Sequence, residues 1–289
     1  MARSYVETMK PVLDIRNLSA VSAAGPILRN ISLTVNQGEA MALVGESGAG
    51  KSAIAKAILG VLPVAIKITS GEIFFGDVNL LKLSPARIRD LLGVRIALIP
   101  QDPLTSLNPS RRIGDQLTDG LRLRAGLSSA AATSKAMELL NDVQIRDSQR
   151  VLKSYPHELS GGMRQRVLIA QAFSLKPQMI IADEPTTALD VTVQKQVLRL
   201  IRQLQQNNAT TLLFISHDLG VVAQICDRMT VLFGGKVLEQ GATTDVLKKP
   251  AHEYTKALLA ANPRYDQPTQ ILKPISETLL AELKQEISA

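Results

Sequence analysis

The sequence predicts an α/β fold built on a largely parallel sheet, and three observations support this prediction. Short apolar runs typical of buried strands alternate along the chain with segments of helical periodicity. Prolines close several of these runs, as at Pro63 and Pro100. The chain has 289 residues, of which 45% are hydrophobic, so it can bury a sizeable core and is not expected to be mainly disordered.

The strands and helices of this sheet are expected in alternation. Buried strands are expected at Met41–Gly45, Val94–Ile99, Met179–Ala182 and Thr211–Ile215. Helices are expected at Lys51–Leu62 and, from apolar residues at helical spacing, at Val193–Gln206.

The remaining segments differ from this pattern. Residues 11–36 alternate like antiparallel strands, and residues 103–165 carry helical patterns, among them Ala131–Val143, without a long apolar strand. Met229–Phe233 and Lys236–Glu239 flank Gly234-Gly235, which predicts a hairpin whose two-residue turn needs positive φ. Ile275–Ile287 has helical spacing, and its function cannot be deduced from the pattern.

No membrane span or secretory signal is expected. The longest uncharged apolar run covers only about ten residues, whereas a spanning helix needs roughly 20. The first ten residues contain Glu7 and no apolar core. We therefore expect the chain to stay in the cytoplasm.

The single cysteine, Cys226, excludes an internal disulfide and a cysteine-based metal cluster. Leu219, Val222, Cys226 and Met229 are spaced like one buried helix face, which predicts an inert thiol in the core.

The net charge of +7 raises the question of nucleic-acid binding. The basic residues are scattered in short pairs, and only nine Phe and Tyr side chains could stack on bases. We therefore expect no nucleic-acid partner, and favour a position near anionic lipid headgroups or acidic proteins.

A phosphate-binding loop is the clearest chemical feature of the sequence. It matches GxxxxGK[ST] and consists of Gly45, Glu46, Ser47, Gly48, Ala49, Gly50, Lys51 and Ser52. It lies between an expected strand and an expected helix, so its backbone N–H groups and the helix N-terminus can bind phosphate. Lys51 is expected to reach the β- and γ-phosphates, and the Ser52 hydroxyl to bind Mg²⁺. The alternative is a chance glycine turn.

Asp183 and Glu184 follow directly after an expected buried strand. With a phosphate loop present, we expect Asp183 to hold Mg²⁺ and Glu184 to polarise the attacking water. The alternative is a solvated acidic pair at a strand end.

A second anion-binding helix start is expected at Ser160-Gly161-Gly162, before the helical run Arg164–Phe173. One bound triphosphate does not need two such ends from one chain. A second copy in a partner subunit explains both, with each segment closing over the nucleotide of the other subunit. The alternative is a simple helix cap.

Three further polar residues follow expected strands. His217 is expected to hydrogen-bond a γ-phosphate, and Gln101 to touch Mg²⁺ or the attacking water. Asp190 either belongs to the site or caps the helix that follows it. His157 and His252 have no partners at ligand spacing and are expected to be structural.

Together and in this order, these motifs resemble the ATP-binding subunit of ABC transporters over roughly residues 12–262. The resemblance makes Gly45–Ser52 the Walker A motif, Gln101 the Q-loop and Leu159–Met163 the signature. It makes Met179–Glu184 the Walker B motif, Thr187–Asp190 the D-loop and His217 the switch histidine. It implies an ABC ATPase domain over residues 1–250, with a helical subdomain at about 103–165, and a tail over 251–289. It also implies an ATPase that uses ATP and Mg²⁺ and works as a head-to-tail cassette dimer.

Finer features resemble the peptide and nickel branch of importers. They are Gln101-Asp102-Pro103, Leu107-Asn108-Pro109, Ser154–Glu158, Met163 and His252-Glu253-Tyr254-Thr255. This branch implies a second, different ATPase chain, two permeases and an extracytoplasmic solute-binding protein, with the ATPase on the cytoplasmic face of the inner membrane. The solute is then nickel, free or chelated, or a short peptide.

The chain departs from this family pattern in two ways. Many oligopeptide-type members carry a cysteine cluster in the tail, and this chain has none. The family usually has an aromatic residue near residues 22–26 to stack on adenine, and Ser22–Pro26 contains none, which predicts weak discrimination between ATP and GTP. Both features resemble nickel-type members.

Two other functions stay open. A non-transport ABC ATPase acting on DNA or ribosomes usually has fused cassettes, a long coiled coil or zinc-binding cysteines, which are absent from this sequence. A regulatory module without turnover has no need of both Glu184 and His217.

Overall fold

The structure is a computed structural model that describes residues 11–187, 189–262 and 274–288. The N-terminal segment, for which no secretory signal is expected, lies outside the described residues, as does Ala188 of the expected D-loop.

A six-stranded sheet forms the centre of the molecule, in the order β10-β9-β3-β8-β7-β6. All neighbouring strands run parallel except β10, which pairs antiparallel with β9. The strands are β3 (Ala40–Val44), β6 (Ile96–Ile99), β7 (Met179–Asp183), β8 (Thr211–Ser216), β9 (Arg228–Phe233) and β10 (Lys236–Ala242). The predicted α/β fold with a mostly parallel sheet is confirmed.

A second, antiparallel sheet has the order β2-β1-β4-β5. Its strands are β1 (Pro11–Ser22), β2 (Gly25–Asn36), β4 (Lys67–Phe75) and β5 (Val78–Asn79). The pairing of β1 with β2 confirms the antiparallel strands expected within residues 11–36. The expected β9–β10 hairpin is also confirmed, since Gly234 and Gly235 have φ of 52° and 79°.

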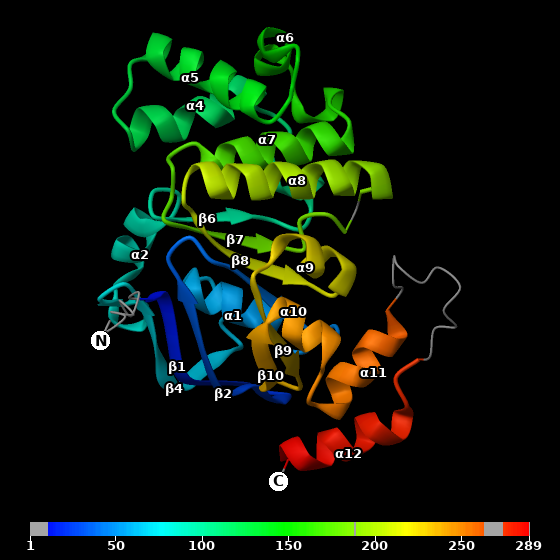
Figure 1. Ribbon diagram of the computed structural model, residues 1–289. Coiled ribbons are helices and arrows are strands. Elements are labelled where there is room, and N and C mark those ends of the chain that lie inside the picture. Colours follow the sequence, from blue (N-terminus) through cyan, green and yellow to red (C-terminus); the bar gives the residue numbers. More distant parts are fainter. Residues whose placement is uncertain (1–10, 188, 263–273, 289) are drawn as a thin grey trace, which may run out of the picture.

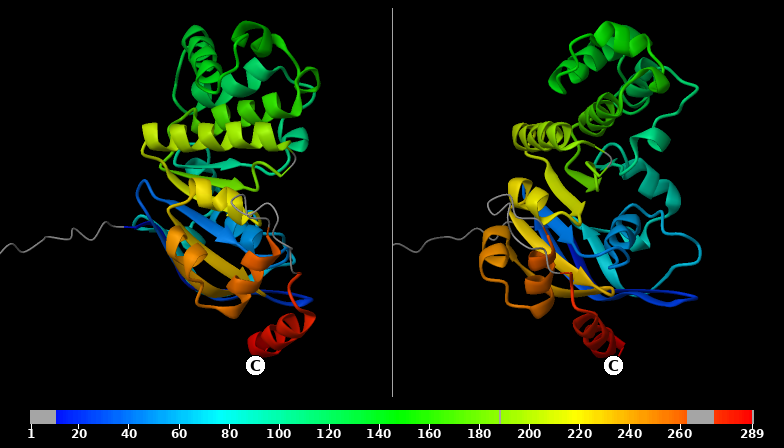
Figure 2. Two further views of the ribbon diagram at one scale, coloured as in Figure 1. Left: turned by 45° about the vertical axis from the view of Figure 1, so that its right-hand side comes forward. Right: turned by 90° about the vertical axis from the view of Figure 1, so that its right-hand side faces the viewer.

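Helices cover both faces of the central sheet (Figure 1). The helices of the described residues are α1 (Lys51–Ile58), η1 (Leu80–Lys82), α2 (Pro85–Leu91), α3 (Pro103–Ser106), α4 (Ile113–Leu123), α5 (Ser129–Asp142), α6 (Ser148–Lys153), η2 (Pro156–Glu158), α7 (Gly161–Phe173), α8 (Val191–Asn207), α9 (Leu219–Ile225), α10 (Thr243–Lys248), α11 (Glu253–Ala261) and α12 (Glu277–Ser288). Between residues 103 and 165, all regular elements are helical, as expected. In both turned views, α12 lies at the opposite end of the molecule from α4 to α6 (Figure 2).

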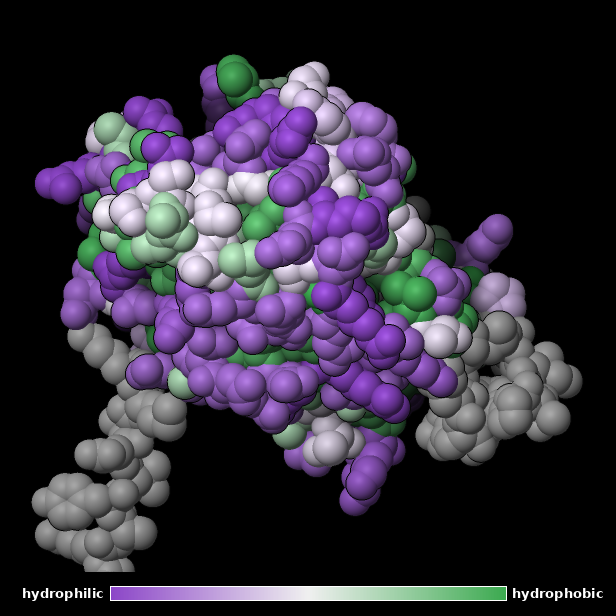
Figure 3. Space-filling view, turned by 90° about the horizontal axis from the view of Figure 1, so that it is seen from above, coloured by the Kyte–Doolittle hydropathy of each residue, from purple (hydrophilic) through white to green (hydrophobic). Residues whose placement is uncertain are grey.

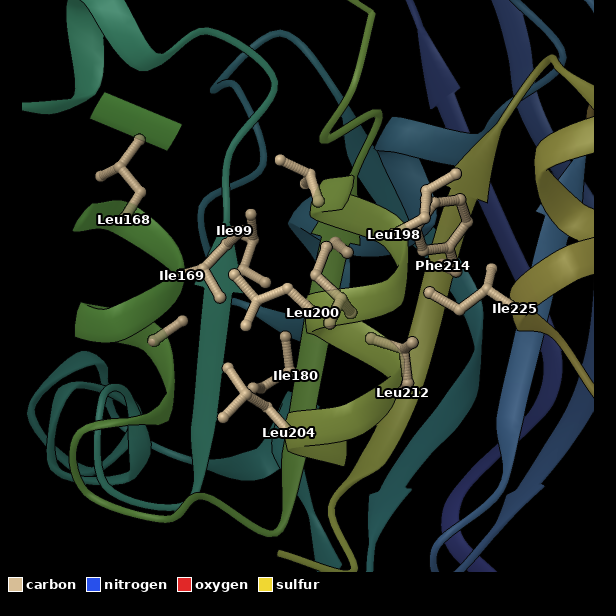
Figure 4. Packing of buried hydrophobic residues seen from close by; sticks show 14 of the residues in the cluster. Ile99, Leu168, Ile169, Ile180, Leu198, Leu200, Leu204, Leu212, Phe214 and Ile225 are labelled. Atoms are coloured by element: carbon tan, nitrogen blue, oxygen red, sulfur yellow. The ribbon is translucent and has the colours of Figure 1, made fainter. Parts of the chain in front are cut away.

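The larger hydrophobic cluster lies between the sheet and the helices α7, α8 and α9. In Figure 4, Ile169 of α7 lies against Ile99 of β6, and Leu200 and Leu204 of α8 lie over Ile180 of β7. This packing holds α7 and α8 against the strands that lead to the polar site residues.

Strand β3 contributes side chains to clusters on both of its faces because successive side chains of a strand point to opposite sides. Ala40, Ala42 and Val44 belong to the larger cluster. Met41 and Leu43 belong to a second cluster, shared with β1, β2, β4 and α1. All five side chains have no exposed surface.

Several expected boundaries were wrong by a few residues, among them those of α1 and β6. Helix α1 ends at Ile58 rather than Leu62, because Gly60 takes a left-handed conformation with φ of 66° and stops the helix. Strand β6 begins at Ile96 rather than Val94.

The expected helix face around Cys226 was also wrong. Helix α9 ends at Ile225, so Cys226 follows the helix, and Met229 lies on β9. All four residues of the pattern are buried, because the strand returns to the same cluster that the helix covers. The expectation of a buried thiol is confirmed.

Among the described residues, no helix is long and apolar enough to span a membrane. Seen from above, the surface over the helical subdomain is largely hydrophilic, and its hydrophobic residues form small separate patches (Figure 3).

Candidate functional site

The phosphate loop follows the end of β3 and leads into α1, as expected. Gly45, Gly48 and Gly50 have φ of 148°, 82° and 103°, a region that glycine adopts readily. A Cβ atom at Gly45 would lie 2.2 Å from the carbonyl oxygen of Leu232, so this position requires glycine. The loop therefore depends on its glycines for both conformation and space.

The Lys51 side chain turns back into the loop, with only 6% of the residue exposed. Its Nζ donates hydrogen bonds to the carbonyl oxygens of Gly45 and Glu46 at 2.6 and 2.8 Å. Burial lowers the pKa of Lys51, while the carboxylates of Glu184, Asp183 and Glu46 oppose this shift. The loop thus contains a buried cation at its centre.

Asp183 ends β7 next to the start of α1. The Ser52 hydroxyl donates to Asp183 Oδ1 at 3.5 Å. Burial is the main cause that raises the pKa of Asp183, and the neighbouring Glu184 raises it further, whereas the Ser52 hydrogen bond lowers it. A hydroxyl and a carboxylate therefore meet beside the phosphate loop, as expected for a Mg²⁺ site.

Glu184 has φ of 44°, and its N–H donates to the carbonyl of Ile215 at 3.0 Å. Its Oε2 accepts hydrogen bonds from Gln101 Nε2 at 3.2 Å and from the Thr187 hydroxyl at 2.9 Å. Its Oε1 lies 3.3 Å from His217 Nδ1. The structure thus brings Gln101, Glu184 and His217 together, and the contact of Thr187 was not anticipated.

A pocket of about 800 Å³ lies over these groups. The phosphate loop, Gln101, Glu184 and His217 line it, together with residues outside the expected site, namely Ile27, Ala53, Leu258, Ala261, Asn262 and Ile275. Sequence reasoning missed this contribution from α11 and the segment before α12. In the sequence, only the aliphatic residues of the tail could have indicated this pocket wall. The same residues are equally typical of a helix packed on the core.

The described residues that line this pocket do not include Ser160, Gly161, Gly162 or Asp190. Ser160 caps α7 by accepting a hydrogen bond from the Met163 N–H at 3.3 Å. Asp190 caps α8 through the N–H groups of Thr192 and Val193 at 3.0 and 2.9 Å. Both helix-cap alternatives thus describe the geometry of the single chain.

His252 caps α11, since its Nδ1 accepts a hydrogen bond from the Tyr254 N–H at 3.0 Å. This agrees with its expected structural role. Within the described ranges, no group of three or more His, Cys, Asp or Glu residues could hold a metal ion. A divalent cation beside Ser52 and Asp183 would therefore need further oxygen ligands from the bound phosphates.

The position of the pocket defines the class of protein. Ligands of open parallel sheets bind outside the carboxyl ends of the strands, and β3, β6, β7 and β8 all end at this pocket. A glycine loop followed by a helix N-terminus binds phosphate groups. The molecule is a phosphate-loop nucleotide-binding protein.

Comparisons with known proteins identify the family. The ABC transporter family profile matches residues 28–187, and the profile described as oligopeptide/dipeptide transporter, C-terminal region, matches residues 238–286. The chain belongs to the ABC transporter family and is an ATPase of the kind that is coupled to transport.

Three relatives illustrate this membership. The probable D,D-dipeptide transport ATP-binding protein DdpD of Escherichia coli (strain K12) is 47% identical over 275 residues, which cover 93% of this chain and 84% of the relative. The dipeptide transport ATP-binding protein DppD of Bacillus subtilis (strain 168) is 43% identical over 275 residues, with coverage of 93% and 82%. The solved structure of the ATP-binding cassette MJ0796, a dimer in a post-hydrolysis state with ADP and Pi, aligns with a TM-score of 0.71 at 25% identity, covering 80% of this chain and 98% of that one.

Proposed function

We propose that this chain hydrolyses Mg-ATP in a membrane importer and couples this reaction to the uptake of di- or oligopeptides. The observation that carries the proposal is the convergence of Gln101, Glu184 and His217 on the pocket of the phosphate loop. The match of the tail to the oligopeptide/dipeptide transporter C-terminal region supports the solute class.

In this proposal the phosphate loop and Lys51 bind the β- and γ-phosphates. To reach them, the Lys51 ammonium exchanges its hydrogen bonds to the Gly45 and Glu46 carbonyls for phosphate oxygens. Because the cation is already buried in the loop, much of its desolvation cost is met before the nucleotide arrives.

Ser52, Asp183 and Gln101 fit a Mg²⁺ ion, since hydroxyl, carboxylate and amide oxygens are hard ligands and Ser52 already contacts Asp183. When bound, Mg²⁺ neutralises the charge that develops on the β- and γ-phosphate oxygens. The residues of the chain then have to position and deprotonate the attacking water.

Glu184 is the proposed general base. Gln101 and Thr187 hold Oε2, and His217 lies beside Oε1, so the carboxylate has a fixed orientation. His217 has a side chain that is 56% exposed, which leaves it accessible to the γ-phosphate from the pocket.

The proposed active unit is a head-to-tail pair of cassettes. Ser160 caps α7, and Gly161 and Gly162 form its first turn away from the pocket, so this helix start is available to close over the nucleotide of a partner. Asp190 belongs to the same proposed interface. The partner is a second ATPase chain, and two permeases, an extracytoplasmic solute-binding protein and the cytoplasmic face of the inner membrane complete the assembly.

Nickel, free or chelated, is the second candidate solute. The absence of a cysteine cluster from the tail and of an aromatic residue at Ser22–Pro26 favours it, because both features resemble nickel-type members. A non-transport role on nucleic acid is the weaker alternative, since no relative named above is described in those terms.

Uptake in a strain that lacks the chain tests the proposal. The strain is complemented with the wild type or with Glu184→Gln, and labelled dipeptide and labelled nickel, with and without a chelator, are followed in parallel. We expect dipeptide uptake to return only with the wild type. Return of nickel uptake instead would assign the chain to metal import, and unchanged uptake of both would reject the importer proposal.

A further inference from the structure

The tail of the chain contacts the phosphate loop directly through Tyr254. The N–H of Glu46 donates a hydrogen bond to the Tyr254 phenol oxygen at 3.3 Å, across 208 residues of sequence. The carbonyl of Glu46 accepts from Lys51 Nζ at 2.8 Å. Both peptide groups of Glu46 are thus held, one by the tail and one by the loop lysine.

The Tyr254 side chain is itself fixed in place. It has no exposed surface, and its ring centroid lies 4.8 Å from that of Phe233 at the end of β9. Burial raises the pKa of the phenol to about 12, so the group remains a neutral hydroxyl under ordinary conditions. Its oxygen is therefore available to accept the Glu46 N–H.

The helix that carries Tyr254 is anchored at its start. The Glu239 carboxylate accepts hydrogen bonds from the N–H groups of Ala251 and His252 at 2.8 and 3.0 Å. His252 in turn caps the helix through the Tyr254 N–H. These contacts tie α11 to β10, and β10 pairs with β9, which is the neighbour of the phosphate-loop strand β3.

The same helix borders the nucleotide pocket. Leu258, Ala261 and Asn262, all beyond Tyr254, line it together with the phosphate loop. One short helix therefore holds the backbone of the phosphate loop and also forms part of the pocket wall. Loss of the Tyr254 hydrogen bond should change the phosphate loop first.

We propose that Tyr254 is a positioning residue of the nucleotide site, which holds the Glu46 peptide so that the phosphate loop is ordered before the triphosphate binds. The inference rests on the proposed role of this loop in binding ATP. A loop that is already ordered pays less conformational entropy on binding. Because a neutral hydrogen bond makes a modest net contribution, its loss should weaken ATP binding by about two- to tenfold.

The test compares Tyr254→Phe with Tyr155→Phe in the full-length chain. Both changes remove only a hydroxyl, and Tyr155 lies in the helical subdomain, stacked on His157 and outside the pocket. Three quantities are measured: the Kd of ATP, hydrogen exchange at the Glu46 amide without nucleotide, and the midpoint of thermal unfolding.

We expect Tyr254→Phe to raise the Kd of ATP and to speed exchange at Glu46, with an almost unchanged unfolding midpoint because the ring still packs on Phe233. Tyr155→Phe should leave the Kd and the exchange rate unchanged. Tyr254→Leu should lower the unfolding midpoint without raising the Kd much beyond that of Tyr254→Phe, which separates packing from positioning.

The wild-type Kd distinguishes this inference from the proposal on which it rests. Wild-type chain that binds ATP, with a Tyr254→Phe variant of equal affinity and equal exchange at Glu46, would overturn the inference and leave the ATPase proposal intact. Wild-type chain that does not bind ATP would overturn both.

Discussion

Glu184 and His217 lie at the ends of neighbouring parallel strands, and Oε1 of the carboxylate is 3.3 Å from Nδ1 of the imidazole. The other carboxylate oxygen accepts hydrogen bonds from Gln101 and Thr187. Each oxygen therefore has its own partners, and the side chain of Glu184 is only 17% exposed. This fixed orientation is what a base needs in order to act on a single water molecule.

Replacing Glu184 with Gln should slow turnover strongly and keep ATP binding. The amide preserves the shape of the side chain but cannot accept a proton, so ATP hydrolysis should fall by about 10²- to 10⁴-fold. Steady-state hydrolysis in the assembled complex and ATP binding to the full-length chain measure the two effects. Glu138→Gln, an exposed residue paired with Lys135 on α5, is the control. Hydrolysis by Glu184→Gln at a rate close to that of the wild type would reject its role as the base.

Replacing Asp183 with Asn should stabilise the chain in the absence of nucleotide and Mg²⁺. Burial raises the folded-state pKa of Asp183, so at neutral pH its ionised form is destabilising relative to the unfolded chain. The neutral amide removes this cost, and the unfolding midpoint should rise by about 2–4 °C for each kcal/mol gained.

The pH dependence gives the sign of the same prediction. The folded Asp183 binds a proton more readily than the unfolded one, so wild-type stability falls as pH rises from the ordinary carboxyl pKa through the raised one. Asn lacks this transition. Thermal scans in EDTA over acid to neutral pH should therefore show a midpoint difference that widens with pH, and a constant difference would contradict the role of burial.

GTP should compete with ATP almost equally well. No aromatic side chain is present at Ser22–Pro26, and Ile27 is the pocket residue that follows this turn. Stacking on an aromatic ring contributes roughly 1–3 kcal/mol per base. Without such a ring, we expect little selection between adenine and guanine. Competition binding with ATP and GTP measures the ratio of the two Kd values, and a strongly ATP-selective site would refute the prediction.

Cys226 should be nearly inert in the folded chain. Burial, and to a lesser extent the charge of Asp227, raises the pKa of the thiol well above its ordinary value. Since the thiolate is the reactive form, alkylation at pH 8 should be slower than in the unfolded chain by on the order of tenfold or more. Mass spectrometry after iodoacetamide treatment, with and without denaturant, measures the rates. Equal rates would place the thiol at the surface.

The convergence of Gln101, Glu184 and His217 could be predicted because each residue follows a strand of the same parallel sheet. The carboxyl ends of such strands share one edge, so local patterns are enough to gather these side chains. The phosphate loop was equally predictable, since its glycines and its strand–loop–helix context are contiguous in the sequence.

The contact between Tyr254 and Glu46 could not be predicted in this way. It joins residues 208 positions apart, and it depends on how β9, β10 and α11 fold back onto the loop. The helix face predicted from the spacing around Cys226 was wrong for a related reason. A helix of seven residues ends at Ile225, and the strand after it buries Met229 in the same cluster, so burial continued after the helical period had stopped.

The alternating side chains of β3 fix the position of the phosphate loop along the strand. The face toward α9 carries two alanines and a valine, whereas the opposite face carries the larger Met41 and Leu43. A slip of one residue, about 3.3 Å, would exchange these sets and force the larger side chains into the space of the alanines. The side-chain volumes on the two faces of β3 therefore fix its register to within one residue. They thereby fix the point along the strand direction at which Gly45 leaves the sheet.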